Sequence, residues 1–228
     1  FVVSKMPQSK EEGAMPSISE TFSTLGKNVK YILGVLAQIL YVGAQIMCWT
    51  YIYQYAEAIG MDSVTAGYYQ MAAFVLFTIG RAVGTYMLRF MSSGKLLMYF
   101  AILAIVFVLG TIFITGMVGL YSLVGVSFCM SLMFPTIYGS ALGDLTEEQS
   151  KVGSAGLIMA IVGGALMPKL QGMIIDAGGN GVADTKIMGV TEVNFSFILP
   201  LICFIYIAWY GLRVFKRHEA TDDVLHNA

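Results

Sequence analysis

Charged side chains are scarce in this sequence. Of its 228 residues, 12% are charged and 57% are hydrophobic, whereas an ordinary soluble domain has about 25% charged residues. A chain with so little polar surface cannot face water on all sides, so we expect it to cross a membrane several times. The net charge of −1 and the lack of a basic patch argue against a nucleic-acid partner.

Catalytic and metal-binding patterns are also missing. The cysteines Cys48, Cys129 and Cys203 stand singly in separate apolar segments, which is typical of small buried residues rather than metal ligands. Both histidines, His218 and His226, lie in the polar C-terminal stretch. The sequence contains no HExxH motif and no paired carboxylates within an apolar segment. An integral-membrane enzyme is therefore disfavoured, and no metal or other cofactor is expected.

The sequence contains six long apolar segments. We predict helices over residues 31–56, 64–91, 96–115, 120–142, 152–175 and 193–214, with residues 115–119 dividing a long uncharged run into the third and fourth. Each is long enough to cross, or nearly cross, a hydrocarbon core of about 30 Å at about 1.5 Å per residue. The predicted fold class is therefore all-α integral membrane, with six transmembrane helices.

The flanking regions are polar. We expect a cytoplasmic linker over residues 1–29, a six-helix bundle over 30–215 and a mobile tail over 216–228. Within the linker, the spacing of Ser17 and Glu20 is that of a capping box. It indicates either a short helix on the membrane surface or a solvated linker. Because the chain begins FVVSK without an initiator Met, we expect it to be the second part of a longer protein.

Positive charge lies mainly on one side of this topology. Six spans place both chain ends on the same side, and the opposite loops carry only Lys186. The positive-inside rule therefore places both ends in the cytoplasm and the bundle in the inner (plasma) membrane. The basic residues near helix ends on the cytoplasmic side are Lys27, Lys30, Arg89, Lys95, Lys151, Arg213, Lys216 and Arg217.

The first apolar segment carries a polar stripe. At 100° per residue, one arc of the helix holds Gln38, Tyr41, Gln45, Trp49 and Tyr53. Unpaired amides are costly in lipid, so this arc must face protein or water. We therefore predict that this helix lines an aqueous path.

The second segment carries a cation, Arg81, well inside the predicted helix. Gly80 and Gly84 are spaced to let another helix approach closely. Arg81 lies about ten residues before the predicted helix end, where an unpaired guanidinium is expensive. Two interpretations stay open: Arg81 extends to the inner interface, or it forms a gate by bonding to a neighbouring helix end or to a carboxylate such as Asp144.

The fourth segment has a second polar face. Ser127, Ser131, Phe134 and Tyr138 share this face, and Pro135 interrupts the backbone ladder beside them. Proline is tolerated in a membrane helix where neighbouring groups satisfy the freed carbonyl, often beside a cavity. Substrate lining is favoured here over simple helix packing.

The fifth segment is rich in small residues. Gly156, Ala160 and Gly164 recur every four residues, with Gly163 adjacent, which favours close helix contact. Lys169 lies in the outer third of this segment; it is either a substrate ligand or, as we favour, a side chain extended to the outer interface.

Carboxylates are absent from the middle of every segment. Glu57, Asp62, Asp144 and Asp176 all lie at or near segment ends. A proton-coupled carrier needs a titratable group inside the membrane, and the sequence of this chain does not supply one.

Several motifs, taken in order, resemble the second half of the L-fucose:proton symporters, which belong to the major facilitator superfamily. The resemblance covers residues 31–214. Its motifs are Tyr41-Val42-Gly43-Ala44-Gln45 with Cys48-Trp49 and Tyr51, Gly80-Arg81-x-x-Gly84, Phe134-Pro135-Thr136-Ile137, and Gly153-Ser154 with Gly163-Gly164.

This resemblance implies two six-helix bundles, each a 3+3 inverted repeat, that rock about a central monosaccharide site. The chain would be the C-terminal bundle, and the acidic residues that carry protons would belong to the N-terminal one. The implied partners are a monosaccharide, the proton, the N-terminal bundle and membrane lipid. The alternatives are a glucose or galactose carrier of the same family and a non-catalytic six-helix membrane scaffold.

The resemblance also assigns roles to residues. It implies that Gln38, Gln45, Trp49, Phe134 and Tyr138 face the sugar, and the polar faces of the same helices add Tyr53 and Ser131. Lys169 departs from the family pattern. The residues expected to act in gating or structure are Gly80, Arg81, Gly84, Pro135, Asp144, Gly163 and Gly164.

Overall fold

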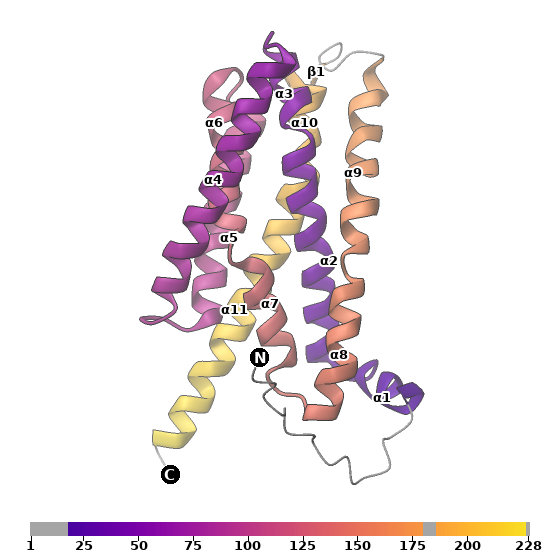
Figure 1. The fold of residues 1–228 in the computed structure, drawn as a ribbon, viewed down its shortest axis with the longest axis vertical. Coiled ribbons are helices and arrows are strands. Elements are labelled where there is room, and N and C mark those ends of the chain that lie inside the picture. Colours follow the sequence, from indigo (N-terminus) through magenta and orange to yellow (C-terminus); the bar gives the residue numbers. More distant parts are fainter. Residues whose placement is uncertain (1–17, 180–185, 227–228) are drawn as a thin grey trace, which may run out of the picture.

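The computed structural model describes residues 18–179 and 186–226, which form an upright bundle of helices (Figure 1). A short helix, α1 (Ile18–Leu25), precedes the bundle. The elements that build the bundle are α2 (Val29–Thr50), α3 (Ile52–Ala58), α4 (Ser63–Met87), α5 (Ser93–Phe113), α6 (Met117–Met130), α7 (Met133–Leu142), α8 (Glu147–Met159), α9 (Val162–Ile175), α10 (Glu192–Ser196) and α11 (Ile198–His226).

Five stretches of the described residues are long and apolar enough to cross a membrane. They are Val29–Ala58, Ser93–Phe113, Met117–Leu142, Glu147–Ile175 and Glu192–Arg217. The predicted second span, α4, is not among them, although its 25 residues would extend about 37 Å at the usual helical rise. Its sequence includes several Tyr, Thr and Gly residues, a glutamine and Arg81, which reduce its mean hydropathy.

Helix boundaries follow from local sequence. Asn28 and Asp62 accept hydrogen bonds from the first backbone N–H groups of α2 and α4, and Thr146 forms a capping box with Gln149 at the start of α8. The predicted division of the third and fourth segments is confirmed, because α5 ends before Gly116 and α6 begins after it. Gly116 has a φ of 83°, a conformation that glycine adopts without strain.

The break between α6 and α7 follows from Pro135. This residue is the third of α7, where a missing N–H removes no hydrogen bond within that helix. Nearby hydroxyls satisfy other carbonyl groups at the break: Ser131 donates to the carbonyl oxygen of Phe128 at 2.7 Å, and Thr136 donates to that of Leu132 at 2.7 Å. The ladder is therefore interrupted at the expected proline.

Small residues allow the helices to approach closely. A β-carbon placed on Gly80 of α4 would overlap the carbonyl oxygen of Phe128 in α6. One placed on Gly163 of α9 would overlap the carbonyl oxygen of Ile39 in α2. The close helix contacts predicted at Gly80 and Gly163 are therefore present, and they leave little freedom for these helices to slide.

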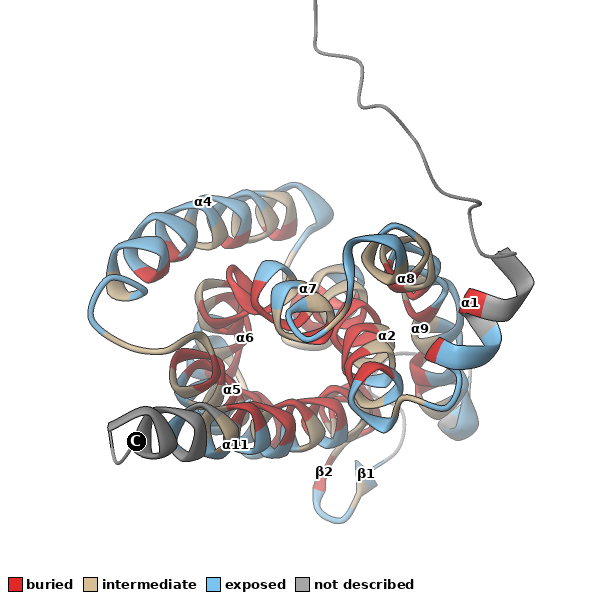
Figure 2. Cartoon of the chain, turned by 90° about the horizontal axis from the view of Figure 1, so that it is seen from below, coloured by how far each residue is buried: buried red, intermediate tan, exposed pale blue. Residues whose placement is uncertain are grey.

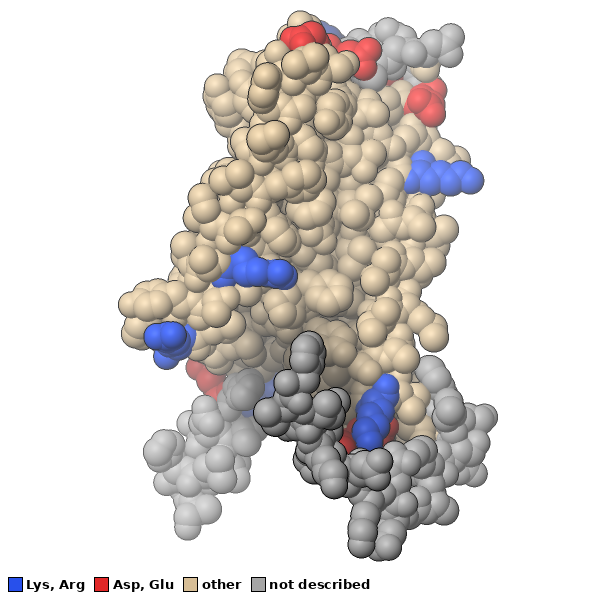
Figure 3. Space-filling view, viewed as in Figure 1, with Lys and Arg blue, Asp and Glu red and all other residues tan. Residues whose placement is uncertain are grey.

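The burial pattern is that of a bundle with an apolar outside. Figure 2 shows buried residues lining the inner sides of α2, α5, α6 and α11, while α4 stands at the edge with most of its surface exposed. Large apolar side chains on α4, such as Met71 and Val75, are more than half exposed. In Figure 3 the middle of the visible face carries few charges, and acidic side chains gather at the end where α3 and α10 lie.

The segments outside the apolar spans differ in part from the predictions. Residues 18–25 form a helix, as one of the two interpretations proposed, whereas residues 1–17, including Ser17, lie outside the described residues. The predicted end of the last helix near residue 214 is wrong, because α11 continues to His226. The loop after α9 contains a 3-10 turn, Asp176–Gly178, and a hairpin that pairs β1 (Lys186–Ile187) with β2 (Val190–Thr191), neither of which was predicted.

Candidate functional site: an aromatic wall and an inner groove

The polar stripe of α2 is not uniformly open. Gln38 is completely buried, and neither atom of its amide group has a hydrogen-bond partner among the described residues. Tyr41 is also buried, and its hydroxyl donates to the carbonyl oxygen of Met130 at 2.9 Å. Gln45 and Trp49 are half-buried. The stripe therefore passes from an enclosed inner half to a more accessible outer half.

Tyr53 continues the stripe into α3. Its side chain is 42% exposed, and its hydroxyl oxygen lies near Gly67 of α4, 3.7 Å from where a β-carbon would stand. Among the predicted substrate-binding residues, Tyr53 is thus the most exposed, and Gln38 and Ser131 are completely buried.

Trp49 is held by three neighbours. Its indole Nε1–H donates to the hydroxyl oxygen of Ser127 in α6 at 3.1 Å. Phe74 and Phe77 of α4 meet its ring edge-on, with centroids 4.9 and 5.2 Å away and interplanar angles of 87° and 74°. Such edge-to-face pairs are favourable because the positive ring edge meets the negative face. Trp49, Phe74, Phe77 and Ser127 are called the aromatic wall below.

A second aromatic group stands on α7. The rings of Phe134 and Tyr138 stack with an interplanar angle of 13° and centroids 6.3 Å apart, and both side chains are half-buried. Tyr41 meets Phe134 edge-on at 6.1 Å, which joins this pair to α2. Ser131 is buried, with its hydroxyl bonded to the backbone of its own helix. The predicted residues thus fall into two aromatic groups rather than one continuous surface.

These groups suit a ligand with both hydroxyls and an apolar face. Aromatic rings offer flat apolar surfaces, while the amide of Gln45 and the hydroxyl of Tyr138 offer hydrogen-bond donors and acceptors. The buried amide of Gln38 adds a group whose desolvation is costly until something bonds to it.

A groove, called the inner groove below, opens between α4, the start of α5 and α7. Its volume is about 470 Å³. The lining residues are Arg81, Thr85, Leu88, Ser93, Leu132, Pro135, Thr136, Gly139 and Ser140. Arg81 is exposed here, and its guanidinium carbon lies 5.5 Å from the centre of the Phe77 ring. A further hollow of about 330 Å³, which also touches Ser93, Gly139 and Ser140, extends toward Asp144 and Arg217.

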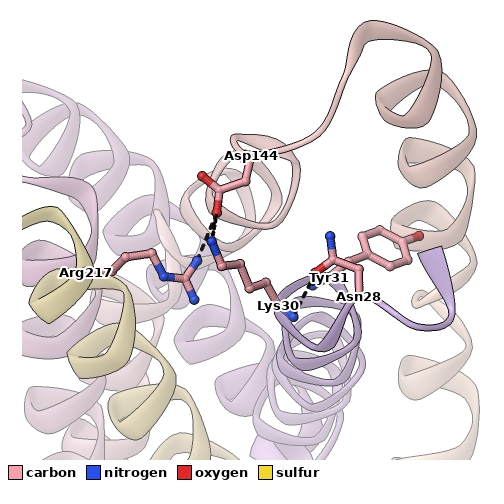
Figure 4. Close-up of polar contacts among 5 residues, drawn as sticks. All are labelled: Asn28, Lys30, Tyr31, Asp144 and Arg217. Carbon is pink, nitrogen blue, oxygen red and sulfur yellow. Dashed lines mark hydrogen bonds and ion pairs between the residues drawn. The ribbon is translucent and has the colours of Figure 1, made fainter. Parts of the chain in front are cut away.

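Asp144 pairs with residues other than Arg81. Figure 4 shows one of its carboxylate oxygens, Oδ2, between Lys30 at the start of α2 and Arg217 near the end of α11. The distances from Oδ2 are 2.9 Å to Nζ of Lys30 and 3.1 Å to Nη1 of Arg217. The hydrogen bond from Lys30 is the main cause that lowers the pKa of Asp144. The proposed Arg81–Asp144 bond is therefore not formed in this structure.

Gly84, Gly164 and Lys169 differ in their surroundings. Gly84 faces Leu132, and Gly164 lies against Ile46 and Val42 of α2, so both act as close packing positions. Lys169 is exposed on α9. The exposed position favours extension of Lys169 away from the bundle over a place in either aromatic group.

The sequence of this chain is similar to those of known sugar symporters. No family model matches the chain. It is 50% identical over 213 residues to the L-fucose-proton symporter of Haemophilus influenzae, an alignment that covers 93% of this chain and 48% of that protein. The L-fucose-proton symporter of Escherichia coli is 33% identical over 90% of this chain and 44% of its own length. The chain is therefore similar to L-fucose-proton symporters over nearly its whole length, and it spans about half of theirs.

Structural comparison agrees. The crystal structure of the major facilitator superfamily transporter FucP in the outward conformation superposes with a TM-score of 0.80 and 30% identity, covering 92% of this chain and 49% of FucP. A glucose/galactose transporter of Brucella abortus is 29% identical over 93% of this chain and 48% of its own length. The predicted resemblance is thus confirmed, and the chain is a multi-pass membrane protein that spans about half the length of these symporter relatives.

Two residues of the aromatic wall were missed from the sequence. Phe74 and Phe77 lie three residues apart on α4, just before Gly80. The available signal was their position on the same helix face as Arg81, but the partner ring, Trp49, lies on a different helix.

Proposed function

We propose that this chain is the C-terminal six-helix bundle of a carrier that moves a monosaccharide together with protons by alternating access. Its similarity to L-fucose-proton symporters over about half of their length supports this proposal. The bundle corresponds to residues 30–215, residues 1–29 to the cytoplasmic linker and residues 216–228 to the cytoplasmic tail. The carrier breaks no covalent bond in its substrate and is not an enzyme.

In this proposal α4 crosses the membrane as well, which brings the number of membrane-spanning segments from five to six. It runs alongside the apolar helices in the bundle (Figure 1) and is long enough to cross. Its exposed face meets the N-terminal bundle rather than lipid alone, which explains why it is less apolar than the others. The six helices then form a 3+3 inverted repeat, with both ends of the chain on the cytoplasmic side of the inner membrane.

The sugar is proposed to bind between the two bundles, against the half-buried residues Gln45, Trp49, Phe134 and Tyr138. The observation that carries this assignment is the aromatic wall, because a hydrogen bond and two ring contacts fix the half-buried Trp49 ring. A fixed, partly accessible ring is suited to stack on the apolar face of a pyranose. Tyr53, Gln38 and Ser131 are assigned to the edges of this site.

A second set of residues, of which Arg81 and Pro135 line the groove, is proposed to act in gating or structure. Gly80, Gly84, Gly163 and Gly164 let helices pack closely enough to move as one body, and Pro135 provides the break in the fourth span. Asp144 ties the ends of three spans together at the cytoplasmic side. Arg81 faces the groove that the N-terminal bundle covers when the inner side closes.

L-fucose is the proposed sugar, since the relatives named L-fucose-proton symporter are 50% and 33% identical to this chain. Glucose or galactose is the second candidate, because a transporter named for those sugars is 29% identical over a similar length. These sugars are all hexoses that offer hydroxyls and an apolar ring face, so the same wall accommodates each of them.

The site assignment is tested by Gln45→Ala and Trp49→Ala in the full-length carrier. Uptake of radiolabelled L-fucose into cells is expected to fall to background for both variants, with the amount of carrier in the membrane unchanged. Trp209→Ala is the matched control, because this tryptophan is 44% exposed on α11 and contacts Tyr206 and Arg213 rather than the aromatic wall. Normal uptake by both test variants would overturn the assignment.

A further inference from the structure

Three side chains form a continuous series from the inner groove to the aromatic wall. The Arg81 guanidinium carbon lies 5.5 Å from the Phe77 ring centre. The Phe77 ring meets Trp49 edge-on at 5.2 Å, and Trp49 donates its indole hydrogen to Ser127 at 3.1 Å. The series therefore joins the groove to the ring proposed to contact sugar.

The backbone beneath this series is fixed. Phe74, Phe77 and Arg81 recur at three- and four-residue spacing, so they share one face of α4. Next to this face the helix holds the buried small residues Ala73 and Gly80, and Gly80 approaches the backbone of α6 too closely for a β-carbon. The close approach at Gly80 restrains the α4 backbone, so we expect movement in the series to come from the side chains.

The guanidinium of Arg81 is the group in the series that can bind a further partner, a carboxylate. Arg81 lies six residues before the last residue of α4, a depth of about 9 Å along the helix. No carboxylate forms an ion pair with it among residues 18–179 and 186–226, and Asp144, the acidic residue at the adjoining hollow, already binds Lys30 and Arg217. A guanidinium at this depth gains energy from a partner, and the groove leaves room for one.

We propose that Phe77 and Arg81 are positioning residues of the sugar site, which relay the state of the inner groove to Trp49. The guanidinium holds the Phe77 ring, and Phe77 holds the indole at the angle that reaches Ser127. A carboxylate from the N-terminal bundle that enters the groove pairs with Arg81 and fixes the series when the inner side is closed. This inference rests on the proposed sugar site.

The end of α4 and the turn that follows it supply a matched control. The guanidinium carbon of Arg89 lies 6.0 Å from the centre of the Tyr86 ring, so it makes the same type of contact from another exposed position. Tyr86 packs edge-on against Phe90 and is not in contact with Trp49. Loss of the Arg89–Tyr86 contact thus removes a cation–π pair without touching the relay.

The first test measures sugar affinity of the purified full-length carrier by calorimetry. Arg81→Ala and Phe77→Leu are each expected to raise the sugar Kd by about three- to tenfold, the factor that one such contact typically contributes. The double variant is expected to be no weaker than the weaker single variant, because both changes cut the same series. Arg81→Lys should recover part of the affinity, and Arg89→Ala and Tyr86→Leu should leave the Kd within about twofold.

The second test observes Trp49 itself. In carrier labelled with 5-fluorotryptophan, the Trp49 fluorine resonance is assigned by its loss in Trp49→Phe. Arg81→Ala, an exposed change that spares the core, is expected to move this resonance, and Arg89→Ala is expected to leave it in place. A Trp49 resonance that Arg81→Ala does not move overturns the relay, even if Phe77→Leu fails to fold.

The outcomes also separate the relay from the sugar site. If Trp49→Ala abolishes sugar binding while the Arg81 and Phe77 effects on Kd are additive or no larger than those of Arg89 and Tyr86, the relay is wrong and the site stands. If Trp49→Ala leaves binding intact but Arg81→Ala still moves the fluorine resonance, the contact series from Arg81 to Trp49 stands, while the sugar site and the positioning role that depends on it are both wrong.

Discussion

Replacement of Asp144 by Asn tests how α2 and α11 are held together beside the loop that follows α7. The carboxylate of Asp144 accepts hydrogen bonds from Lys30 and Arg217, which come from the first and last helices of the bundle. The side chain is half exposed, so each pair is screened by water and contributes about 0.5–1 kcal/mol. Loss of both pairs is therefore expected to cost about 1–2 kcal/mol. For a bundle of this size that corresponds to a fall in Tm of about 2–8 °C.

The assay is thermal unfolding of the full-length carrier in detergent, with Glu147→Gln as the matched control. Glu147 forms an ion pair with Lys151 one turn away on the same helix, at 3.6 Å and with both side chains mostly exposed. Its removal is expected to cost about 0.3–0.5 kcal/mol. High salt should narrow the difference between Asp144→Asn and the unsubstituted carrier, since it screens exposed charges.

The stabilisation that the ion pairs of Asp144 provide depends on pH in a defined way. Because its partners lower the pKa of Asp144 in the folded protein, the folded state binds this proton less tightly than the unfolded state does. The stabilisation is therefore fully present above the unfolded pKa of about 3.9, and it is lost as pH falls through the lower folded value. Asp144→Asn should remove this part of the acid sensitivity. Equal changes in Tm for Asp144→Asn and Glu147→Gln at neutral pH would refute the cross-bundle role.

Two further predictions concern packing and the outer end. Gly163→Ala should lower Tm because its β-carbon overlaps the Ile39 carbonyl oxygen, at a cost of about 1–3 kcal/mol. Its control is Gly139→Ala, whose β-carbon meets nothing within 4 Å and which should leave Tm unchanged or slightly higher. Equal Tm values for the two variants would contradict the close helix contact. Asn194→Ala should cost about 1–3 kcal/mol, because the buried amide donates to the carbonyl oxygen of Thr111 at 2.9 Å, and an unchanged melt would show that this bond contributes nothing.

Most of the fold could be predicted because length and hydropathy are local properties. Each of the predicted apolar segments is mostly helical in the structure, and Gly116 and Pro135 mark breaks that follow from their own backbone chemistry. The division of the fifth segment into α8 and α9 was not predicted, and the second segment ends at Met87 rather than at residue 91. The errors occur where those signals fade. The last helix continues beyond residue 214 through polar sequence that carries no hydrophobic signal, and the short hairpin at residues 186–191 follows from a turn rather than from a periodic pattern.

The site was less predictable, because burial depends on neighbouring helices. Helical periodicity placed Gln38 and Trp49 on one arc, yet packing encloses Gln38 completely and leaves Trp49 half-buried. The contacts of Trp49 with α4 join residues about 25 positions apart, which no local pattern reveals.

Charge pairing was the least predictable feature. Asp144 was an available partner for Arg81 by sequence, but Lys30 and Arg217 lie closer once the helix ends assemble. The choice among several basic residues at one end of a bundle is a matter of three-dimensional distance, which sequence spacing cannot supply.

The central claim is that this chain is half of a proton-coupled sugar carrier, and one measurement tests it most directly. The full-length protein is reconstituted into liposomes, and uptake is measured for L-fucose, D-glucose and D-galactose with and without an inward proton gradient. The account predicts that one of these sugars accumulates against its concentration gradient only when the proton gradient is present. Sugar uptake that ignores the proton gradient, or no uptake of any of the three sugars by correctly inserted protein, would contradict it.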